Sequence, residues 1–158
     1  SAVDVLCNLE PGVLAKYADH IIPRLEDVKW QVRWSAVQAL SKLEPGVLAH
    51  HIVPRLDDED CGVRWSAVEA LGKLEPEVLA KYADDIVPRL EDEECEVRES
   101  AVDVLCNLEP GVLAKYAHHI VSRLEDEDFE VRTYAVQALG KLEPGVIAKY
   151  ADDISRSA

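Results

Sequence analysis

The chain has 158 residues, 48% of them hydrophobic and 30% charged, a balance that suits one soluble domain with a continuous core. Its 17 Lys and Arg stand against 31 Asp and Glu, so the formal net charge is −14 at pH 7. A surface this acidic repels polyphosphate, which argues against nucleic acid as a partner. No stretch approaches the roughly 20 apolar residues of a membrane helix, and the N-terminus lacks the residue order of a signal peptide. We therefore expect a soluble, cytoplasmic protein without membrane contact.

A tandem repeat of about 34 residues fills the sequence. The N-terminal segment SAVDVLCNLEPGVLAKYADHIIPRLEDVKWQVRW recurs along the chain, with a second copy three residues shorter and a last copy that stops after its first helix. The expected repeats are 1–34, 35–65, 66–99, 100–133 and 134–158. Because nothing is left over for another domain, we predict one repeat domain over residues 1–158.

Each repeat contains two helical patterns. The first begins at a proline such as Pro11, which loses nothing at the first helical position because an N–H there would be unpaired, and its apolar residues recur every three or four positions. A later proline such as Pro23 predicts a kink, which should be weaker in the fourth repeat, where Ser122 replaces it. The second helix follows an acidic turn and carries an apolar face made of Val32, Ala36, Ala39, Leu40 and Leu43. Since β-strand alternation appears nowhere, we predict an all-α solenoid of stacked antiparallel helix pairs.

A motif within the repeat distinguishes it from tetratricopeptide repeats, which share the 34-residue period. The segment Leu25-Glu26-Asp27, followed by Val32-Arg33 and then by Ala36 and Ala39-Leu40, resembles the HEAT-like repeat family, in particular its short, phycobilisome-lyase-type form. The resemblance implies a right-handed α-solenoid (superhelix) with the second helices on its concave side. It also implies a hydrogen-bonded ladder between successive repeats, which is physically sensible because Arg can donate two parallel bonds to a carboxylate. The ladder residues are Asp27, Arg33, Asp58, Arg64, Asp92, Arg98, Asp126 and Arg132.

The polar side of the second helix offers candidate contacts for a partner. If the apolar face is buried, then Gln31, Trp34, Ser35 and Gln38 point to the concave surface. Trp34 and Trp65 occupy one position in adjacent repeats, and large exposed aromatics are enriched in interface hot spots. Carboxylates stand near them, which favours a partner that brings Arg or Lys beside apolar side chains. The expected partner-binding residues are Trp34, Gln38, Trp65, Glu69, Glu99, Asp103, Tyr134 and Gln137.

The same residues also allow purely structural interpretations. Each Trp could cover aliphatic side chains of its neighbour, and the carboxylates could simply keep the solenoid soluble. We expect Trp30 and Phe129, near the start of the second helix, to pack at the junctions between repeats.

The histidines and cysteines do not form a recognisable site. His20, His51 and His119 share one position of the first helix, and His50 and His118 precede two of them. Adjacent residues on a helix do not face each other and equivalent residues lie a full helix spacing apart, so we expect no metal site. The four cysteines lack C-x-x-C spacing, and we expect reduced thiols at Cys7, Cys61, Cys95 and Cys106. No catalytic residue set and no cofactor are expected.

These observations predict a non-catalytic scaffold that binds a protein partner, a basic peptide or helix, on the concave surface. One alternative is a bilin lyase-like, chromophore-handling protein, which the family resemblance permits. The other is a repeat scaffold or spacer, natural or engineered, without a specific ligand. Apolar helix faces at the ends of the repeat array also predict end-to-end self-association through uncapped terminal repeats.

Overall fold

The computed structural model of the protein describes residues 5, 9–43, 45–151 and 155. These residues form α-helices and short 3₁₀ helices, and no strand occurs among them. The chain divides into two compact units, Ser1–Leu74 and Glu75–Ala158, which are described separately below. In the described ranges, every helix is too short or too polar to cross a bilayer. The all-α class predicted from the repeat is confirmed.

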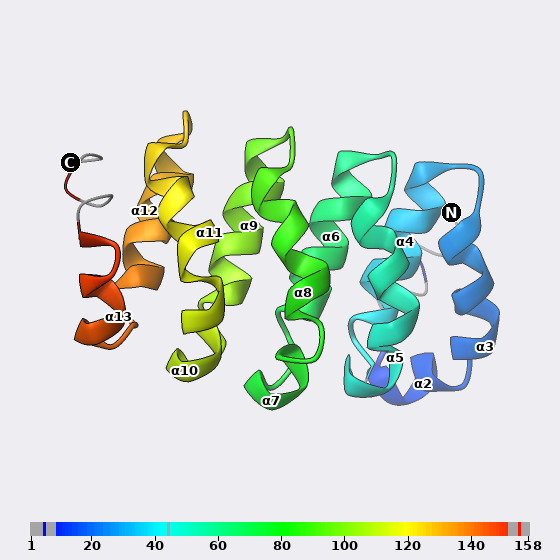
Figure 1. Cartoon of the computed structure of the whole chain (residues 1–158). Helices are drawn as coiled ribbons and strands as arrows, with labels where there is room; N and C mark the ends of the chain where they lie inside the picture. Colours follow the sequence, from blue (N-terminus) through cyan, green and yellow to red (C-terminus); the bar gives the residue numbers. More distant parts are fainter. Residues whose placement is uncertain (1–4, 6–8, 44, 152–154, 156–158) are drawn as a thin grey trace. The chain divides into compact units, whose positions relative to one another are not determined.

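Unit 1 contains two successive helix pairs (Figure 1). Its elements are α2 (Pro11–Ala15), α3 (Ala18–Ile21), η1 (Ile22–Glu26), α4 (Trp30–Leu40), α5 (Pro45–Ile52), η2 (Val53–Asp57) and α6 (Cys61–Leu71). The second helix of each pair packs on the 3₁₀ end of the first, α4 on η1 and α6 on η2. Because α4 and α6 also pack against each other, the second helices form one layer of the unit.

Unit 2 repeats this arrangement. Its elements are α7 (Pro76–Leu79), α8 (Ala83–Ile86), η3 (Val87–Glu91), α9 (Cys95–Leu105), α10 (Pro110–Leu113), η4 (Ala114–Tyr116), α11 (Ala117–Ser122), η5 (Arg123–Glu125), α12 (Phe129–Leu139) and α13 (Pro144–Ala148). Here α9 packs on η3, α12 packs on η5, and α9 and α12 pack side by side. Each unit is therefore a stack of helix pairs in which the second helices adjoin.

The first helix of most repeats is broken, where the sequence predicts one kinked helix. Tyr17, Tyr82 and Tyr116 end the break, with φ near −110° and ψ near 0° (−108° and 3° at Tyr17). The Tyr82 N–H bonds to the Leu79 carbonyl at 2.9 Å, three residues back, which is 3₁₀ rather than α spacing. The second repeat lacks the Lys-Tyr-Ala segment, and there α5 runs unbroken. The three-residue deletion thus removes the break.

The late prolines set where the α-helix gives way to a 3₁₀ helix. Pro23, Pro54 and Pro88 each stand second in η1, η2 and η3, because proline has no N–H to continue the α-helical bonding. In the fourth repeat Ser122 has an N–H, and α11 continues through Ser122 before the short η5 begins. The weaker distortion predicted at Ser122 is confirmed.

The predicted apolar face of the second helix lies in the core, with one exception. Ala36, Ala39 and Leu40 are inaccessible to solvent and Leu43 is 8% exposed. Val32 is half-buried, whereas its counterparts in the later repeats are fully buried.

The N-caps of the second helices differ between repeats. Asp128 accepts hydrogen bonds from the N–H groups of Glu130 and Val131 at 2.8 and 3.2 Å, but Glu94 makes no such side-chain cap at the same position. We expect Glu94→Asp to raise the free energy of unfolding by about 1 kcal/mol, because the shorter side chain reaches the orphan N–H groups. Urea denaturation checks this, with Asp128→Ala as the reverse control that should lose a similar amount. Unchanged stability of Glu94→Asp would contradict it.

Candidate functional site

Arginine–aspartate pairs join successive repeats within each unit. In unit 1, Nε and Nη2 of Arg33 donate to Oδ2 and Oδ1 of Asp58, both at 2.8 Å, while Nη1 donates to the Asp27 carbonyl at 2.9 Å. In unit 2, Arg98 donates to Asp126 in the same way, at 2.9 and 2.8 Å. Each pair ties the start of a second helix to the acidic turn of the following repeat.

The other ladder residues also form hydrogen bonds within the acidic turn of their own repeat. Nη1 of Arg64 donates to the Asp58 carbonyl at 2.9 Å, and Nη1 of Arg132 donates to the Asp126 carbonyl at 2.7 Å. The carboxylate of Asp92 accepts from the N–H of Glu94 at 3.1 Å. These bonds fix the turn that presents each aspartate.

A second arginine in each unit also contacts the turn aspartate of the ladder, and it is not among the ladder residues predicted from the sequence. Nη1 of Arg55 bonds to the Leu25 carbonyl at 2.8 Å and lies 3.3 Å from Oδ2 of Asp58. Arg123 repeats this pattern in unit 2 with the Leu90 carbonyl, at 2.9 Å. The sequence contains a signal for this second arginine, because an arginine stands three residues before the turn aspartate in each of the four complete repeats.

The buried aspartates of the ladder stay ionised. Burial by itself would raise the pKa of Asp126, but the hydrogen bonds from Arg98 and from the Asp128 N–H outweigh it and hold that pKa below its ordinary value. The same balance lowers the pKa of Asp58 beside Arg33. Their contribution to stability is therefore complete above the pKa of the unfolded chain and is lost as the pH falls through the lowered value.

In unit 1, two part-exposed indoles lie on the adjoining second helices α4 and α6. Trp34 is half-buried and Trp65 is 37% exposed, so neither indole is enclosed in the core. Between the helices, Nε2 of Gln38 donates to Oγ of Ser66 at 2.9 Å. Glu69 is half-buried on α6. The predicted contact residues of this unit therefore sit on one packed pair of helices, and we call Trp34, Gln38, Trp65 and Glu69 the unit 1 surface.

Ser35, which the sequence predicts beside Trp34 on the concave side, is not part of that surface. Ser35 is 2% exposed, and the equivalent Ser66 and Ser100 are 1% and 5% exposed, so the predicted placement of Ser35 on the accessible side is wrong. α4 packs against α6, and a small side chain at this position lets the helices approach closely. Tyr134 takes this position on α12 and is half-buried.

In unit 2, the predicted contact residues Glu99, Asp103, Tyr134 and Gln137 form what we call the unit 2 surface. Glu99 is half-buried, whereas Asp103 and Gln137 are exposed. Burial, a hydrogen bond to Glu130 and the negative charges of Glu130, Asp128 and Asp103 raise the pKa of Glu99 to about 7. The contact between α9 and α12 thus raises the pKa of Glu99 into the neutral range.

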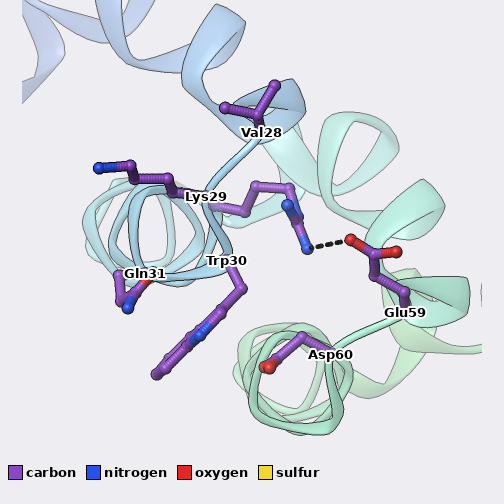
Figure 2. Close-up of a pocket in the computed structure, with 7 residues that line it drawn as sticks. Val28, Lys29, Trp30, Gln31, Glu59 and Asp60 are labelled. Carbon is purple, nitrogen blue, oxygen red and sulfur yellow. Dashed lines mark hydrogen bonds and ion pairs between the residues drawn. The ribbon is translucent and has the colours of Figure 1, made fainter.

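Trp30 is a residue whose role sequence reasoning missed. Trp30 and Phe129 are 45% and 64% exposed, so the expectation that they pack at repeat junctions is wrong. Trp30 lines an open pocket of about 590 Å³ between the start of α4 and the turn before α6 (Figure 2). Its other walls come from residues 28, 29 and 31, from Arg33, and from Glu59 and Asp60. The pocket depends on where the following turn lies, which helical periodicity does not reveal.

Adjacent histidines do face each other, contrary to the expectation from helix geometry. The ring centroids of His50 and His51 are 3.9 Å apart at an interplanar angle of 41°, and those of His118 and His119 are 3.9 Å apart at 38°. Side-chain rotation brings the rings together although the Cβ atoms diverge. Burial and the neighbouring His118 lower the pKa of His119. Across the described residues, no three His, Cys, Asp or Glu side chains are arranged to hold a metal ion.

Two of the described cysteines, Cys95 and Cys106, have raised pKa values. Cys61, Cys95 and Cys106 are free, and Cys7 lies outside the described residues. Burial raises the pKa of Cys106 to about 11, and a hydrogen bond to Glu96 at 3.3 Å raises that of Cys95. Because the thiolate is the reactive form, both side chains are inert near neutral pH.

Comparison with known proteins agrees with this architecture. A family model described as HEAT repeats matches residues 18–105, more than half of the chain, and one described as HEAT-like repeat matches residues 96–142. The comparison with curated protein sequences gives no match.

Among solved structures, a computationally designed armadillo repeat protein for modular peptide recognition is 20% identical, with a TM-score of 0.76 over 99% of this chain and 82% of that chain. A designed armadillo repeat protein in complex with the peptide (KR)4 is 19% identical, with a TM-score of 0.73 over 99% of this chain and 80% of that chain. A homology model of the AP-3 complex is 21% identical, with a TM-score of 0.74 over 98% of this chain and 30% of that chain. These likenesses show the repeat-solenoid fold alone. The chain belongs to the HEAT-repeat family.

Proposed function

We propose that this protein is a non-catalytic scaffold that binds a basic peptide or helix on the exposed side of its second helices. The observation that carries the proposal is the pair of part-exposed indoles, Trp34 and Trp65, at equivalent positions of adjoining helices. An indole face attracts a cation, and it contributes contact area with little loss of conformational entropy.

Charge supports a basic partner in both units. Glu69 lies on the same helix as Trp65, and Asp103 is exposed on α9 near Glu99. The whole chain has a formal charge of −14, which attracts a cationic peptide from a distance and raises its association rate at low salt. The peptide (KR)4 held by the designed armadillo protein gives a partner of this chemistry as a probe.

The test replaces both indoles of the unit 1 surface. We expect Trp34→Ala/Trp65→Ala to weaken binding of an alternating Lys-Arg octapeptide by about tenfold or more, because large desolvated aromatics dominate interface energies. Isothermal titration calorimetry at low salt measures the affinity.

Phe129→Ala is the control, since Phe129 is an even more accessible aromatic outside both surfaces. It should leave peptide binding unchanged. Circular dichroism and the melting temperature report whether the double variant remains folded. Full retention of binding by a folded double variant rejects the unit 1 surface as the binding site.

Two narrower features belong to the same proposal. The free cysteines support a cytoplasmic location, since unpaired thiols persist in a reducing compartment.

The exposed side of α12 supports contact with a second copy of the chain. Val136 is 60% exposed, whereas the equivalent Val102 is covered where α9 packs on α12. Sedimentation velocity should show concentration-dependent association of the protein, and Val136→Lys should reduce it.

A further inference from the structure

We propose that the pocket beside Trp30 receives an arginine side chain of the partner, whose guanidinium stacks on the indole and is held by Glu59 and Asp60. The proposal deepens the proposed function and rests on it for the partner, but the pocket can be tested without any peptide. Trp30 is one helical turn before Trp34 on α4, so the pocket continues the unit 1 surface toward the acidic turn.

The charges that line the pocket favour a cation. Arg33 also reaches it, but its guanidinium is neutralised by two 2.8 Å bonds to Asp58 and its side chain is only 6% exposed. Its second ion pair, to Glu59 at 3.5 Å, is long, and the Glu59 side chain is 86% exposed. Figure 2 shows the Lys29 ammonium extending away from both carboxylates. The Asp60 carboxylate therefore lies on the side of the pocket that adjoins the indole, and the exposed Glu59 carboxylate faces Arg33 on the opposite wall.

The shape of the pocket favours arginine among cations. Trp30 is 45% exposed, and Figure 2 shows its indole in the space between the start of α4 and Asp60. A guanidinium is planar, so it can stack on such a ring while its edge donates hydrogen bonds to carboxylates. One Asp60 oxygen caps α6 by accepting from the Val63 N–H at 3.1 Å, which fixes the carboxylate at the rim. The ammonium group of lysine is not planar and cannot stack on the indole in this way.

The test uses a small molecule and reads Trp30 directly. Nα-acetyl-arginine amide is titrated into the protein while the indole Nε1–H resonance of Trp30, assigned with Trp30→Phe, is followed by NMR. We expect a saturable shift of that resonance. The isosteric, uncharged Nα-acetyl-citrulline amide should bind at least about fivefold more weakly, because it loses the cation–π and ionic attraction.

Matched charge variants locate the site. Glu59→Gln/Asp60→Asn should weaken arginine binding at least about fivefold, and Asn at position 60 keeps the helix cap. Glu127→Gln/Asp128→Asn makes the same change at the equivalent place in unit 2, where Glu127 lies 3.7 Å from Arg98, and it should change nothing. An equal response to citrulline, no saturable shift, or an unchanged affinity in the first variant overturns the proposal.

A gain of binding tests whether an indole beside these carboxylates suffices. Cys95 occupies the Trp30 position in unit 2, beside the corresponding Glu127 and Asp128. The new indole of Cys95→Trp should respond to arginine, and a folded variant whose new indole is unmoved overturns the proposal. If the octapeptide fails to bind while Trp30 responds to arginine, the proposed function fails and the pocket stands. If the octapeptide binds but the Trp30 resonance does not respond to arginine, the proposed arginine site is rejected and the proposed function stands.

Discussion

Replacing Arg98 with alanine should lower the free energy of unfolding of unit 2 by about 3 kcal/mol, because it removes both short charged bonds to the buried Asp126 carboxylate and leaves only the 3.3 Å ion pair with Arg123. The side chains of Arg98 and Asp126 are 7% and 3% exposed, and two bonds of 2.9 and 2.8 Å join them. Urea denaturation followed by circular dichroism measures the loss. Amide hydrogen exchange in α9 and α12 locates it in unit 2.

Two comparisons separate the pair from arginine in general. Arg132→Ala removes an arginine from the same repeat position, but this side chain is half-buried and donates to main-chain oxygens of Asp126 and Glu127. Arg132→Ala should lower the free energy of unfolding by only about 1–2 kcal/mol. The double variant Arg98→Ala/Asp126→Ala should lose less than the sum of the two single changes, since neither member of this buried pair is left without the other. Strictly additive losses would show that the ion pair itself is not what stabilises the unit.

The arrangement of helix pairs could be predicted from the sequence because it depends on features that recur with the repeat. The apolar spacing of Ala36, Ala39 and Leu40 identifies the buried face, and the recurring Asp and Arg identify both partners of the ladder bonds. Ser122 in place of proline predicts where an α-helix extends further. Each of these inferences needs only the chain's local chemistry, repeated at one period.

The candidate sites could be predicted less well because they depend on distances between repeats. Ser35 looks polar and therefore accessible, yet the neighbouring helix covers it. Trp30 looks like a packing residue, yet the turn at Glu59 and Asp60 leaves an open pocket beside it. Glu99 and Glu130 are 31 residues apart in the sequence, and Glu130 raises the pKa of Glu99 only because α9 and α12 adjoin. No pattern along a single helix contains these separations.

Glu99 should titrate near pH 7, far above the ordinary glutamate value of 4.5, because it is partly buried and is hydrogen-bonded to Glu130. NMR of ¹³C-labelled carboxyl groups measures the midpoint. Glu130→Gln should lower it by removing a neighbouring charge, but not to 4.5, because burial is the largest cause of the shift. A midpoint near 4.5 in the unaltered protein would contradict the raised pKa of Glu99.

The sign of the stability effect follows from this shift. Between pH 4.5 and about 7 the folded protein holds a proton on Glu99 that the unfolded chain has released. The contribution of this group to stability is therefore complete below pH 4.5 and is lost as the pH rises to about 7. Glu99→Gln, which stays neutral, should remove this part of the pH dependence in urea denaturation measured from about pH 5 to 8.

Peptide binding should have the opposite dependence. As the pH rises through about 7, Glu99 gains a full negative charge on the unit 2 surface, so the affinity for the Lys-Arg octapeptide should increase. Every other titratable group, the five histidines included, remains in Glu99→Gln, which isolates the share due to Glu99. Glu109→Gln, an exposed carboxylate before α10, is the charge-matched control and should keep the full pH dependence. An affinity that rises equally in all three proteins would assign the effect to the histidines and remove Glu99 from the binding surface.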